Sequence, residues 1–597
     1  MVKKLSFLHN FKWFSNSTVG AKWRYSFLLM LVCFLFTFNQ YGFEYIDIDD
    51  QHVFWDNPRL EIDSISEALK LFVPQISHGV VEYMPVKDIS LALDRHLFGI
   101  KSPFIRVQSF FWYGLSAVFC FLFVAHLFRQ FVIRQNLKIT SRQLYFLAFL
   151  LSLSFIVHPV HVNSWGWISS RKDLLSGAFG FVFLWSYLVF KSKTKLRFLL
   201  IAFLSYALAL LAKPTSAFLP LVLFGYEILY LKKEEIFSFK TIRKFNWLIV
   251  LSVFTLLYAI WYHYLTTAQF QIGSNSQWEE SVILPYSCLP LWIVQFAHYI
   301  RMAVLPYGIM LLQVYEFPAI LSFDFVSSTV LVLILLISCI WGLYKNRLVS
   351  FGVLFFVLSL LPTIATNPFE QYWATRYFFF GVFGILLIFA ALILQYEKVR
   401  PKHFMLIIAV ILSLGMLGHA YSNNFASSIK LWKYHTDVKI DHWTAYKRLA
   451  KAYYNDRQFD KSLASFAKCS HFRPESLECA IAQGELMFLL LPDDLKQQAI
   501  DVMLNLTKQD GSGHVLRKLA PMYWKMGKSD KALQTYAEGF NNKQWRVEDM
   551  IEYAEFLWEA GRRELAMKKL DLVDSVRESW EPDTVELRRR WKKELSL

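Results

Sequence analysis

Residues 158–175, HPVHVNSWGWISSRKDLL, follow one apolar segment and lead directly into another. Two imidazoles, two cations and a carboxylate are therefore concentrated in one short loop between two expected membrane spans. Polar groups at the edge of a membrane are costly to keep and usually serve a task. We therefore expect functional residues in this loop.

The composition of the whole chain is that of a membrane protein. Of 597 residues, 55% are hydrophobic and only 18% are charged, against about 25% in soluble domains. The formal net charge is +16, and the basic residues lie in short loops between apolar runs, as the positive-inside rule predicts. Because no basic face or base-stacking motif accompanies this charge, we expect membrane lipids as surroundings and no nucleic-acid partner.

Hydropathy and loop charge predict a topology of about eleven transmembrane helices. The spans are expected near residues 25–41, 108–128, 143–158, 174–190, 197–212, 216–231, 246–265, 327–344, 348–362, 377–395 and 403–421. Residues 1–43 carry five basic residues and no acid, which predicts a cytoplasmic N-terminus. The loop 43–107 carries eleven acidic and six basic residues and is predicted to be external, as is the HPVH loop.

The segment 284–306 decides the sidedness of everything that follows it. It is apolar, but Gln295, His298 and Arg301 recur every three residues and form a polar stripe on a helix. If the helix crosses, the later basic loops lie outside, whereas a helix flat on the outer surface leaves them inside. We predict an interfacial helix, which places the C-terminal region outside the cytoplasm.

The C-terminal region, residues 425–597, is predicted to be a tetratricopeptide (TPR) α-solenoid, separate from a membrane domain at 1–424. Amphipathic helix pairs recur there with a period near 34 residues, and four pairs are expected, the second degenerate. The matching positions are Leu449, Ala450, Tyr453, Phe459, Phe466 and Pro474, then Leu519, Ala520, Tyr523, Gly527, Ala532 and Tyr536, then Ala554, Gly561 and Ala566. Such a module either packs as a cap or presents a peptide-binding groove.

Two cysteines of this region, Cys469 and Cys479, are ten residues apart. A disulfide is allowed if the region is extracytoplasmic, but packing is the favoured interpretation because sequence does not give the geometry.

The first external loop carries four carboxylates within ten residues, among them Asp49 and Asp50. Carboxylates at this place can act as a general base or bind a cation. They can equally form a helix cap or a solvated acidic turn.

Two chemistries suit the HPVH loop. His158 and His161 would need a third ligand to hold zinc, and no suitable partner motif accompanies them, so no metal site is predicted. The second chemistry is a polar lining for a phosphate-bearing lipid, with Arg171 and Lys172 on the phosphate and the imidazoles as hydrogen-bond donors. Arg376, in another predicted external segment, has the same potential role.

Several motifs, in the same order, resemble the transmembrane-and-TPR O-mannosyltransferases and their bacterial relatives. They are the Asp49-Asp50 loop, HPVHxxSWxWISSRKDLL, ALLAKPTSAFLPLVLFGYE (209–227), ATRYFF (374–379) and the TPR tail. The resemblance covers nearly the whole chain and implies the GT-C fold, an all-α polytopic membrane protein.

The resemblance also implies roles for individual residues. Asp49 and Asp50 match the family's catalytic acids, and His158, His161, Arg171, Lys172 and Asp173 match its second-loop motif. Arg376 and Tyr377 match a late Arg-Tyr pair, and His298 and Arg301 are further candidates for the cavity lining.

The chain departs from the family pattern at four places. Asn163 and Thr375 stand where the family usually has acids, Tyr83-Met84-Pro85 replaces Tyr-Arg-Pro, and Lys213-Pro214 replaces Lys-Glu.

The activity implied is inverting transfer of mannose or a similar hexose from a polyprenyl-phosphate donor to a hydroxyl of an acceptor. The acceptor is expected to be a Ser or Thr of a secreted or membrane protein, presented by the TPR region. No further cofactor is expected, and a divalent metal is not favoured. The bacterial inner membrane, with a periplasmic C-terminal domain, is preferred to the endoplasmic reticulum. The alternative is a catalytically degenerate, membrane-anchored TPR scaffold; a transporter fits poorly because no paired inverted repeat is evident.

Overall fold

A computed structural model describes residues 18–74, 83–100, 103–230, 245–273, 289–313, 319, 322–364, 374–395, 401–474, 476–540, 547–576, 587–591 and 593. Every regular element in these ranges is a helix, which confirms the all-α prediction. The chain divides into two compact units, and the second comprises the described residues from Tyr264 to Gly273 and those from Trp432 onward. The predicted boundary was a few residues earlier, after 424.

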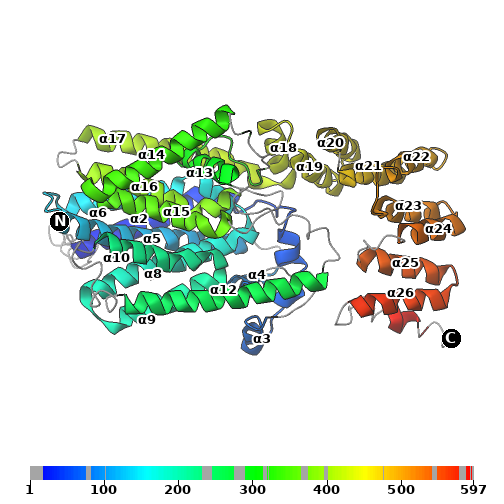
Figure 1. Cartoon of the computed structure of the whole chain (residues 1–597), viewed down its shortest axis with the longest axis horizontal. Helices are drawn as coiled ribbons and strands as arrows, with labels where there is room; N and C mark the ends of the chain where they lie inside the picture. The colour runs from blue at the N-terminus through cyan, green and yellow to red at the C-terminus, as the bar shows by residue number, and fades with distance from the viewer. Residues whose placement is uncertain are drawn as a thin grey trace, which may run out of the picture. The chain divides into compact units, whose positions relative to one another are not determined.

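The first unit contains the apolar helices (Figure 1), except that the helix Asn246–Gly273 belongs to the second unit from Tyr264 onward. They are α2 (Thr18–Thr37), α5 (Phe104–Arg134), α6 (Ser141–Val157), α8 (Arg171–Lys193), α9 (Leu196–Ala212), α10 (Leu219–Leu229), α12 (Asn246–Gly273), α13 (Leu289–Val304), α14 (Phe323–Lys345), α15 (Arg347–Ile364), α16 (Phe379–Gln395) and α17 (Pro401–Ser422). Shorter helices are α3 (Ile65–Lys70), α4 (Pro85–Phe98), α7 (Val162–Trp165) and α18 (Ser428–Val438), the last crossing the division between the units.

Each of the eleven predicted spans falls on one of these apolar helices. Among the helices in the described ranges, seven are long and apolar enough to cross a membrane, or eight if one bent pair counts as a single span, which is consistent with a membrane protein. Three further apolar helices, in 196–212, 214–229 and 347–363, are shorter. The total of eleven crossings therefore stays a prediction.

The bent pair lies at the HPVH motif. Residues 141–157 and 159–165 are bent by 47°. His158, between them, is extended (φ −66°, ψ 125°), the conformation that a following proline favours, and Pro159 then starts a 3₁₀ turn. The sequence thus ends helix α6 at the loop that carries the candidate residues.

Helices α15 and α16 approach each other backbone to backbone. A Cβ atom at Gly352 would lie 2.8 Å from the carbonyl oxygen of Gly384, and one at Gly384 would lie 2.7 Å from that of Gly352. Small residues allow such close contact between apolar helices. The contact fixes α16, whose N-terminus follows the Arg376 segment.

The second unit consists mainly of helix pairs. The helices are α19 (Trp443–Asn455), α20 (Phe459–Phe472), α21 (Leu477–Leu490), α22 (Lys496–Thr507), α23 (His514–Lys525), α24 (Ser529–Gly539), α25 (Val547–Glu559) and α26 (Arg563–Val576). Figure 1 shows them following one another in chain order. They correspond to the four predicted pairs, while the TPR solenoid itself stays a prediction.

Three of the four pairs share one turn. Arg457, Gly527 and Gly561 have φ of 60°, 73° and 77°, the left-handed region that favours glycine. In each turn the N–H of the next residue bonds to a carbonyl five residues earlier, over 2.8–3.0 Å. The second pair lacks this turn, in agreement with its degenerate sequence.

The structure corrects the interpretation of the two cysteines. Cys469 and Cys479 form a disulfide with a Cα–Cα distance of 6.0 Å, within the core of the first helix pairs. The sequence does not reveal that α21 packs alongside α20, which is what brings the two cysteines together.

Candidate functional site

The acidic loop that follows α2 is fixed to the HPVH–RKDLL loop by Asp50. Its Oδ1 atom accepts hydrogen bonds from the backbone N–H of Ser169 (2.9 Å) and from the Ser169 hydroxyl (2.5 Å). Its Oδ2 atom accepts from the backbone N–H of Ile46 (3.2 Å). Asp50 is 1% exposed, and burial raises its pKa to about 6 although the bonds from Ser169 act in the opposite direction. The two candidate loops therefore meet.

Asp49 differs from its neighbour because it is only half-buried. Its backbone carbonyl accepts from the N–H of Val53 (2.7 Å) at the start of the single π-helical turn Gln51–Trp55. The sequence does not distinguish the two acids, whereas the structure does. Asp50 anchors the loop, and Asp49 has the more accessible carboxylate.

Arg106, which the sequence interpretation missed, strengthens the same junction. This buried side chain at the start of α5 donates to the carbonyl oxygens of Gly166 (3.0 Å) and Glu44 (2.5 Å). It therefore ties the beginning of the first loop to the second. Its position within the predicted 43–107 loop, next to an apolar run, gave no sign of this role.

Arg171 is committed to protein partners, and its role at the donor phosphate stays a prediction. Its guanidinium is completely buried and forms an ion pair with Asp94. It also donates to Gln108 Oε1 (2.6 Å), Ser109 Oγ (3.1 Å) and the Ile105 carbonyl (2.5 Å). Each guanidinium nitrogen thus has a protein acceptor. Arg171 joins α8 to α4 and α5, and its contacts do not support direct phosphate binding.

A second group of charges lies at the same end of α8 and is here called the cationic cluster: Lys213, Arg376, Asp173, Trp167 and Tyr377. Asp173 forms a buried ion pair with Lys213, whose Nζ lies 5.2 Å from the Tyr377 ring centroid. The Arg376 guanidinium carbon lies 4.9 Å from the Trp167 ring centroid and 5.2 Å from that of Tyr377. Three segments distant in sequence therefore bring two cations together.

Lys172, the remaining predicted phosphate ligand, adjoins Asp173 in the first turn of α8 and is 8% exposed. Arg376 is also 8% exposed, and Lys213 is 7% exposed. Lys213 was noted in the sequence only as a departure from the family pattern. Its ion pair with Asp173, forty residues earlier, could not be inferred from spacing.

Within the part of the chain that the structure describes, the stretch from Trp167 to Asp173 contains three buried polar atoms without a hydrogen-bond partner. They are Trp167 Nε1, Ser170 Oγ and Asp173 Oδ2. Buried polar groups are nearly always satisfied by protein, water or a ligand. The cluster is therefore a place where a polar ligand or ordered water is expected.

The two histidines bind main-chain carbonyls. His161 has its Nδ1 2.7 Å from the Phe155 oxygen and its Nε2 3.0 Å from the Phe379 oxygen. The His158 Nε2 lies 3.1 Å from the Ala303 oxygen, and its Nδ1 accepts from the backbone N–H of Val160 (3.3 Å). These contacts hold the ends of α6, α13 and α16 together, and they do not place an imidazole on a phosphate.

Two departures from the family pattern, Asn163 and Thr375, contact each other. The Asn163 amide donates to the Thr375 hydroxyl oxygen and to the Met310 carbonyl (3.2 Å), and its Oδ1 accepts from the Tyr421 hydroxyl (2.7 Å). Both residues are buried. A neutral, hydrogen-bonded pair thus occupies the place where the resemblance implies two acids.

The two candidates on α13, His298 and Arg301, are packed within the first unit. His298 is 6% exposed. Arg301 binds Asp324 Oδ1 (2.9 Å) and Ser327 Oγ (2.9 Å) at the start of α14. The same helix supports the Arg376 segment, because the Tyr299 hydroxyl donates to the Ala374 carbonyl (3.3 Å). A supporting role for α13 is visible, whereas contact of His298 or Arg301 with a headgroup stays a prediction.

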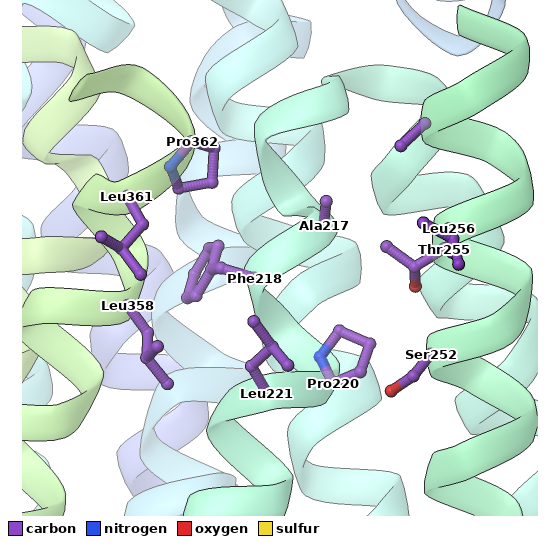
Figure 2. Close-up of a pocket in the computed structure, with 11 residues that line it drawn as sticks. Ala217, Phe218, Pro220, Leu221, Ser252, Thr255, Leu256, Leu358, Leu361 and Pro362 are labelled. Atoms are coloured by element: carbon purple, nitrogen blue, oxygen red, sulfur yellow. The ribbon is translucent and has the colours of Figure 1, made fainter. Parts of the chain in front are cut away.

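An apolar pocket of about 280 Å³ begins four residues after Lys213 (Figure 2). Figure 2 shows Phe218 and Leu221 on one wall, Thr255 of α12 on another and Leu358 of α15 on a third. The full lining is Ala217, Phe218, Pro220, Leu221, Ser252, Thr255, Leu256, Ala259, Leu358, Leu361 and Pro362. Apart from two hydroxyls, this lining suits hydrocarbon.

Metal coordination finds no support in the described ranges, where no group of three His, Cys, Asp or Glu side chains could hold an ion. Cys33 and Cys120 are buried thiols within helices α2 and α5.

Comparison with known proteins adds little to this geometry. No protein-family model matches the chain, and no curated protein matches it. Among solved structures, one match is titled "Crystal structure of MamA protein", with 20% identity and a TM-score of 0.21, covering 26% of this chain and 85% of that one. A likeness this weak does not carry over a fold or a function.

Proposed function

We propose that this chain is a membrane glycosyltransferase of the GT-C type, which moves a hexose from a polyprenyl-phosphate donor to a hydroxyl acceptor. The observation that carries the proposal is the junction made by Asp50 and Ser169. It brings an acidic external loop to the loop that begins α8, where cations and unpartnered polar atoms are gathered. A base and a charge-stabilising cluster are the two elements that inverting transfer from a lipid phosphate needs.

In the proposed reaction, Asp49 acts as the general base. Its carboxylate removes the proton from a Ser or Thr hydroxyl, and the oxygen forms a bond to the anomeric carbon of the sugar. The bond between that carbon and the phosphate oxygen breaks, its electron pair stays with the phosphate, and the configuration at the carbon inverts. Asp50, enclosed and anchored to Ser169, is a positioning residue for Asp49.

The leaving group is a polyprenyl phosphate, which needs positive charge but no acid. Lys213, Lys172 and Arg376 are the proposed partners of its oxygens. In a poorly hydrated site such cations stabilise developing negative charge strongly. A bound phosphate would also give a partner to the Trp167 Nε1 and Ser170 Oγ atoms.

The apolar pocket beside Lys213 is the proposed seat of the polyprenyl chain. Its lining comes from Pro220 and its neighbours, from α12 and from α15. Lys213 precedes Ala217, the first residue of this lining, by four positions in the sequence. A donor whose phosphate binds Lys213 would therefore have its hydrocarbon chain near the segment that lines the pocket. The phosphate of the donor is thus assigned to cationic surroundings and its polyprenyl chain to an apolar pocket.

The proposed reaction takes place outside the cytoplasm. The Cys469–Cys479 disulfide supports this sidedness for the second unit, because disulfides persist in oxidising compartments. We propose the bacterial inner membrane, with the second unit in the periplasm; the endoplasmic reticulum lumen is the eukaryotic equivalent. Acceptor proteins are the proposed partners of the TPR-like helices. No metal is assigned a role.

The test is intact-mass spectrometry of secreted and membrane proteins from cells that carry wild-type chain, no chain, or a variant. Asp49→Asn should remove the same hexose-sized mass as deletion of the chain, because the base is lost. Asp63→Asn, which makes the same change at an exposed position of the same loop, should keep that mass. Wild-type glycans in the Asp49→Asn, Asp50→Asn double variant would sink the catalytic proposal.

A membrane-anchored scaffold is the second candidate, and the neutral Asn163–Thr375 pair favours it because two acids implied by the resemblance are absent together. In that case deletion of the chain produces a defect, the double variant rescues it, and no glycan mass changes.

A further inference from the structure

The second unit contains a pocket that the proposed reaction does not use. It has a volume of about 410 Å³, within the ~300–1,000 Å³ range of ligand sites. Its floor is apolar and includes Phe466, Leu486, Phe488 and Met522. Phe466 and Leu486 belong to one hydrophobic core cluster, whereas Phe488 and Met522 belong to the next. The pocket therefore opens where the cores of successive helix pairs meet.

The charge around this pocket is mostly positive. Lys451 of α19, Lys496 at the start of α22, and Lys518 and Lys525 of α23 line it, with Glu485 as its single acid. The nearest partner of Lys518, Asp549 (3.7 Å), is already held by Arg517 (3.1 Å). Lys496 also pairs with the exposed Asp493 (2.5 Å). The pocket lining therefore holds four amines from three helices against the single lining carboxylate of Glu485.

Apolar groups also reach solvent at this opening. Leu489 is 54% exposed and Tyr454 is 43% exposed, and both line the pocket. Exposed apolar groups beside lysines suit a ligand that carries apolar side chains and carboxylates together. A lysine ammonium binds such carboxylates as a point charge without a fixed geometry.

We propose that this pocket binds an extended acidic peptide segment, with an apolar side chain on the floor and Asp or Glu carboxylates against the lysines. A single lipid headgroup offers one anionic centre, whereas amines from three helices match several carboxylates spaced along a chain. The inference rests on the proposed function, in which the helix pairs of the second unit receive acceptor proteins, although none of the pocket residues belongs to the site in the first unit.

The test uses the full-length protein in detergent micelles at low ionic strength and a fluorescein-labelled peptide, Asp-Asp-Leu-Phe-Asp-Asp, followed by fluorescence anisotropy. Saturable binding is expected, and added salt should weaken it. The double change Lys451→Glu, Lys525→Glu should weaken binding by about tenfold or more, the result of losing roughly 1.4 kcal/mol of attraction. Leu489→Asp should weaken it independently, since it removes apolar contact.

The matched control is Lys508→Glu with Lys568→Glu, two exposed lysines of the same unit that do not line the pocket. This variant should bind the peptide as the wild type does. Equal weakening by both double variants would overturn the pocket assignment. Equal binding of an Asn-Asn-Leu-Phe-Asn-Asn peptide would overturn the acidic specificity. Displacement of the acidic peptide by dihexanoyl phosphatidylglycerol, without displacement by unlabelled peptide, would assign the pocket to a lipid instead.

Discussion

The Asp50 carboxylate shows how one residue can set the pH range of a site. Its pKa is raised to about 6 by burial, so the folded chain binds this proton more tightly than the unfolded chain does. The contribution of Asp50 to stability is therefore greatest at low pH and is lost as pH rises through about 6. The hydrogen bonds that join the two loops favour the ionised form of Asp50 instead. Its carboxylate oxygens accept from Ile46 and Ser169, and a proton on either oxygen would compete with these donors.

From this we predict that transfer activity falls as pH is lowered through about 6. Ser169→Ala removes a hydroxyl that lowers the pKa of Asp50, so the acid limb of the pH profile should move to higher pH. Ser164→Ala, which deletes a buried hydroxyl without a partner in the described ranges, should leave the limb in place. The measurement is hexose transfer to a peptide acceptor between pH 5 and 8. An unmoved limb in Ser169→Ala would show that another group controls the profile.

Residue identity alone does not separate a ligand-binding arginine from a structural one. Arg171 suits a phosphate and a buried ion pair equally well, and the deciding residue, Asp94, lies 77 positions earlier in the chain. The same holds for the histidines, whose carbonyl partners Ala303 and Phe379 come from distant helices. The sequence predicted which loops carry polar residues, but the partners of these residues depend on tertiary contacts.

At the scale of elements, Arg171 is the link that fastens α4 and α5 to the first turn of α8. We predict that Arg171→Met destabilises the first unit by about 3–5 kcal/mol, because it leaves the buried Asp94 carboxylate without its cation. Adding Asp94→Leu should recover much of this loss, since the unpaired charge disappears. Thermal unfolding in detergent, followed by fluorescence-detected size-exclusion chromatography, measures both effects.

A partly exposed pair provides the control for this cycle. The Arg301 and Asp324 side chains are 36% and 54% exposed, so Arg301→Met should cost about 1 kcal/mol or less. If Arg171→Met is as stable as Arg301→Met, then Arg171 is not a structural link, and a role at the donor phosphate would again be open.

Helix positions were predictable because apolar runs and polar loops alternate clearly. Every predicted span has a helix, and the repeat of about 34 residues included the turn glycines Gly527 and Gly561, whereas the matching turn at Arg457 was not predicted. Helix lengths were less predictable. Residues 214–229 and 347–363 form apolar helices that are short. Pro159 and Pro214 begin 3₁₀ turns that interrupt the α-helical path, and hydropathy averaged over a window does not detect these interruptions.

At the scale of the whole molecule, the sidedness of the chain depends on α13. Its described part, Leu289–Val304, carries the polar residues that the sequence places on one stripe of the helix. Its polar residues Gln295 and His298 are buried against protein, while Leu289 is 54% exposed. A helix that buries its polar stripe against protein can lie at the membrane surface with its apolar residues toward lipid.

We therefore predict that α13 does not cross the membrane. Alkaline phosphatase fused after Leu265 should be active outside the cytoplasm, whereas the same enzyme fused after Tyr344 should be inactive, because α14 alone crosses between these points. Fusions after Lys195 and Ser216 supply the cytoplasmic and external references. Activity at both Leu265 and Tyr344 would mean that α13 and α14 both cross. The later loops would then exchange sides, and the second unit would face the cytoplasm. In that reducing compartment the Cys469–Cys479 disulfide would not be expected to persist.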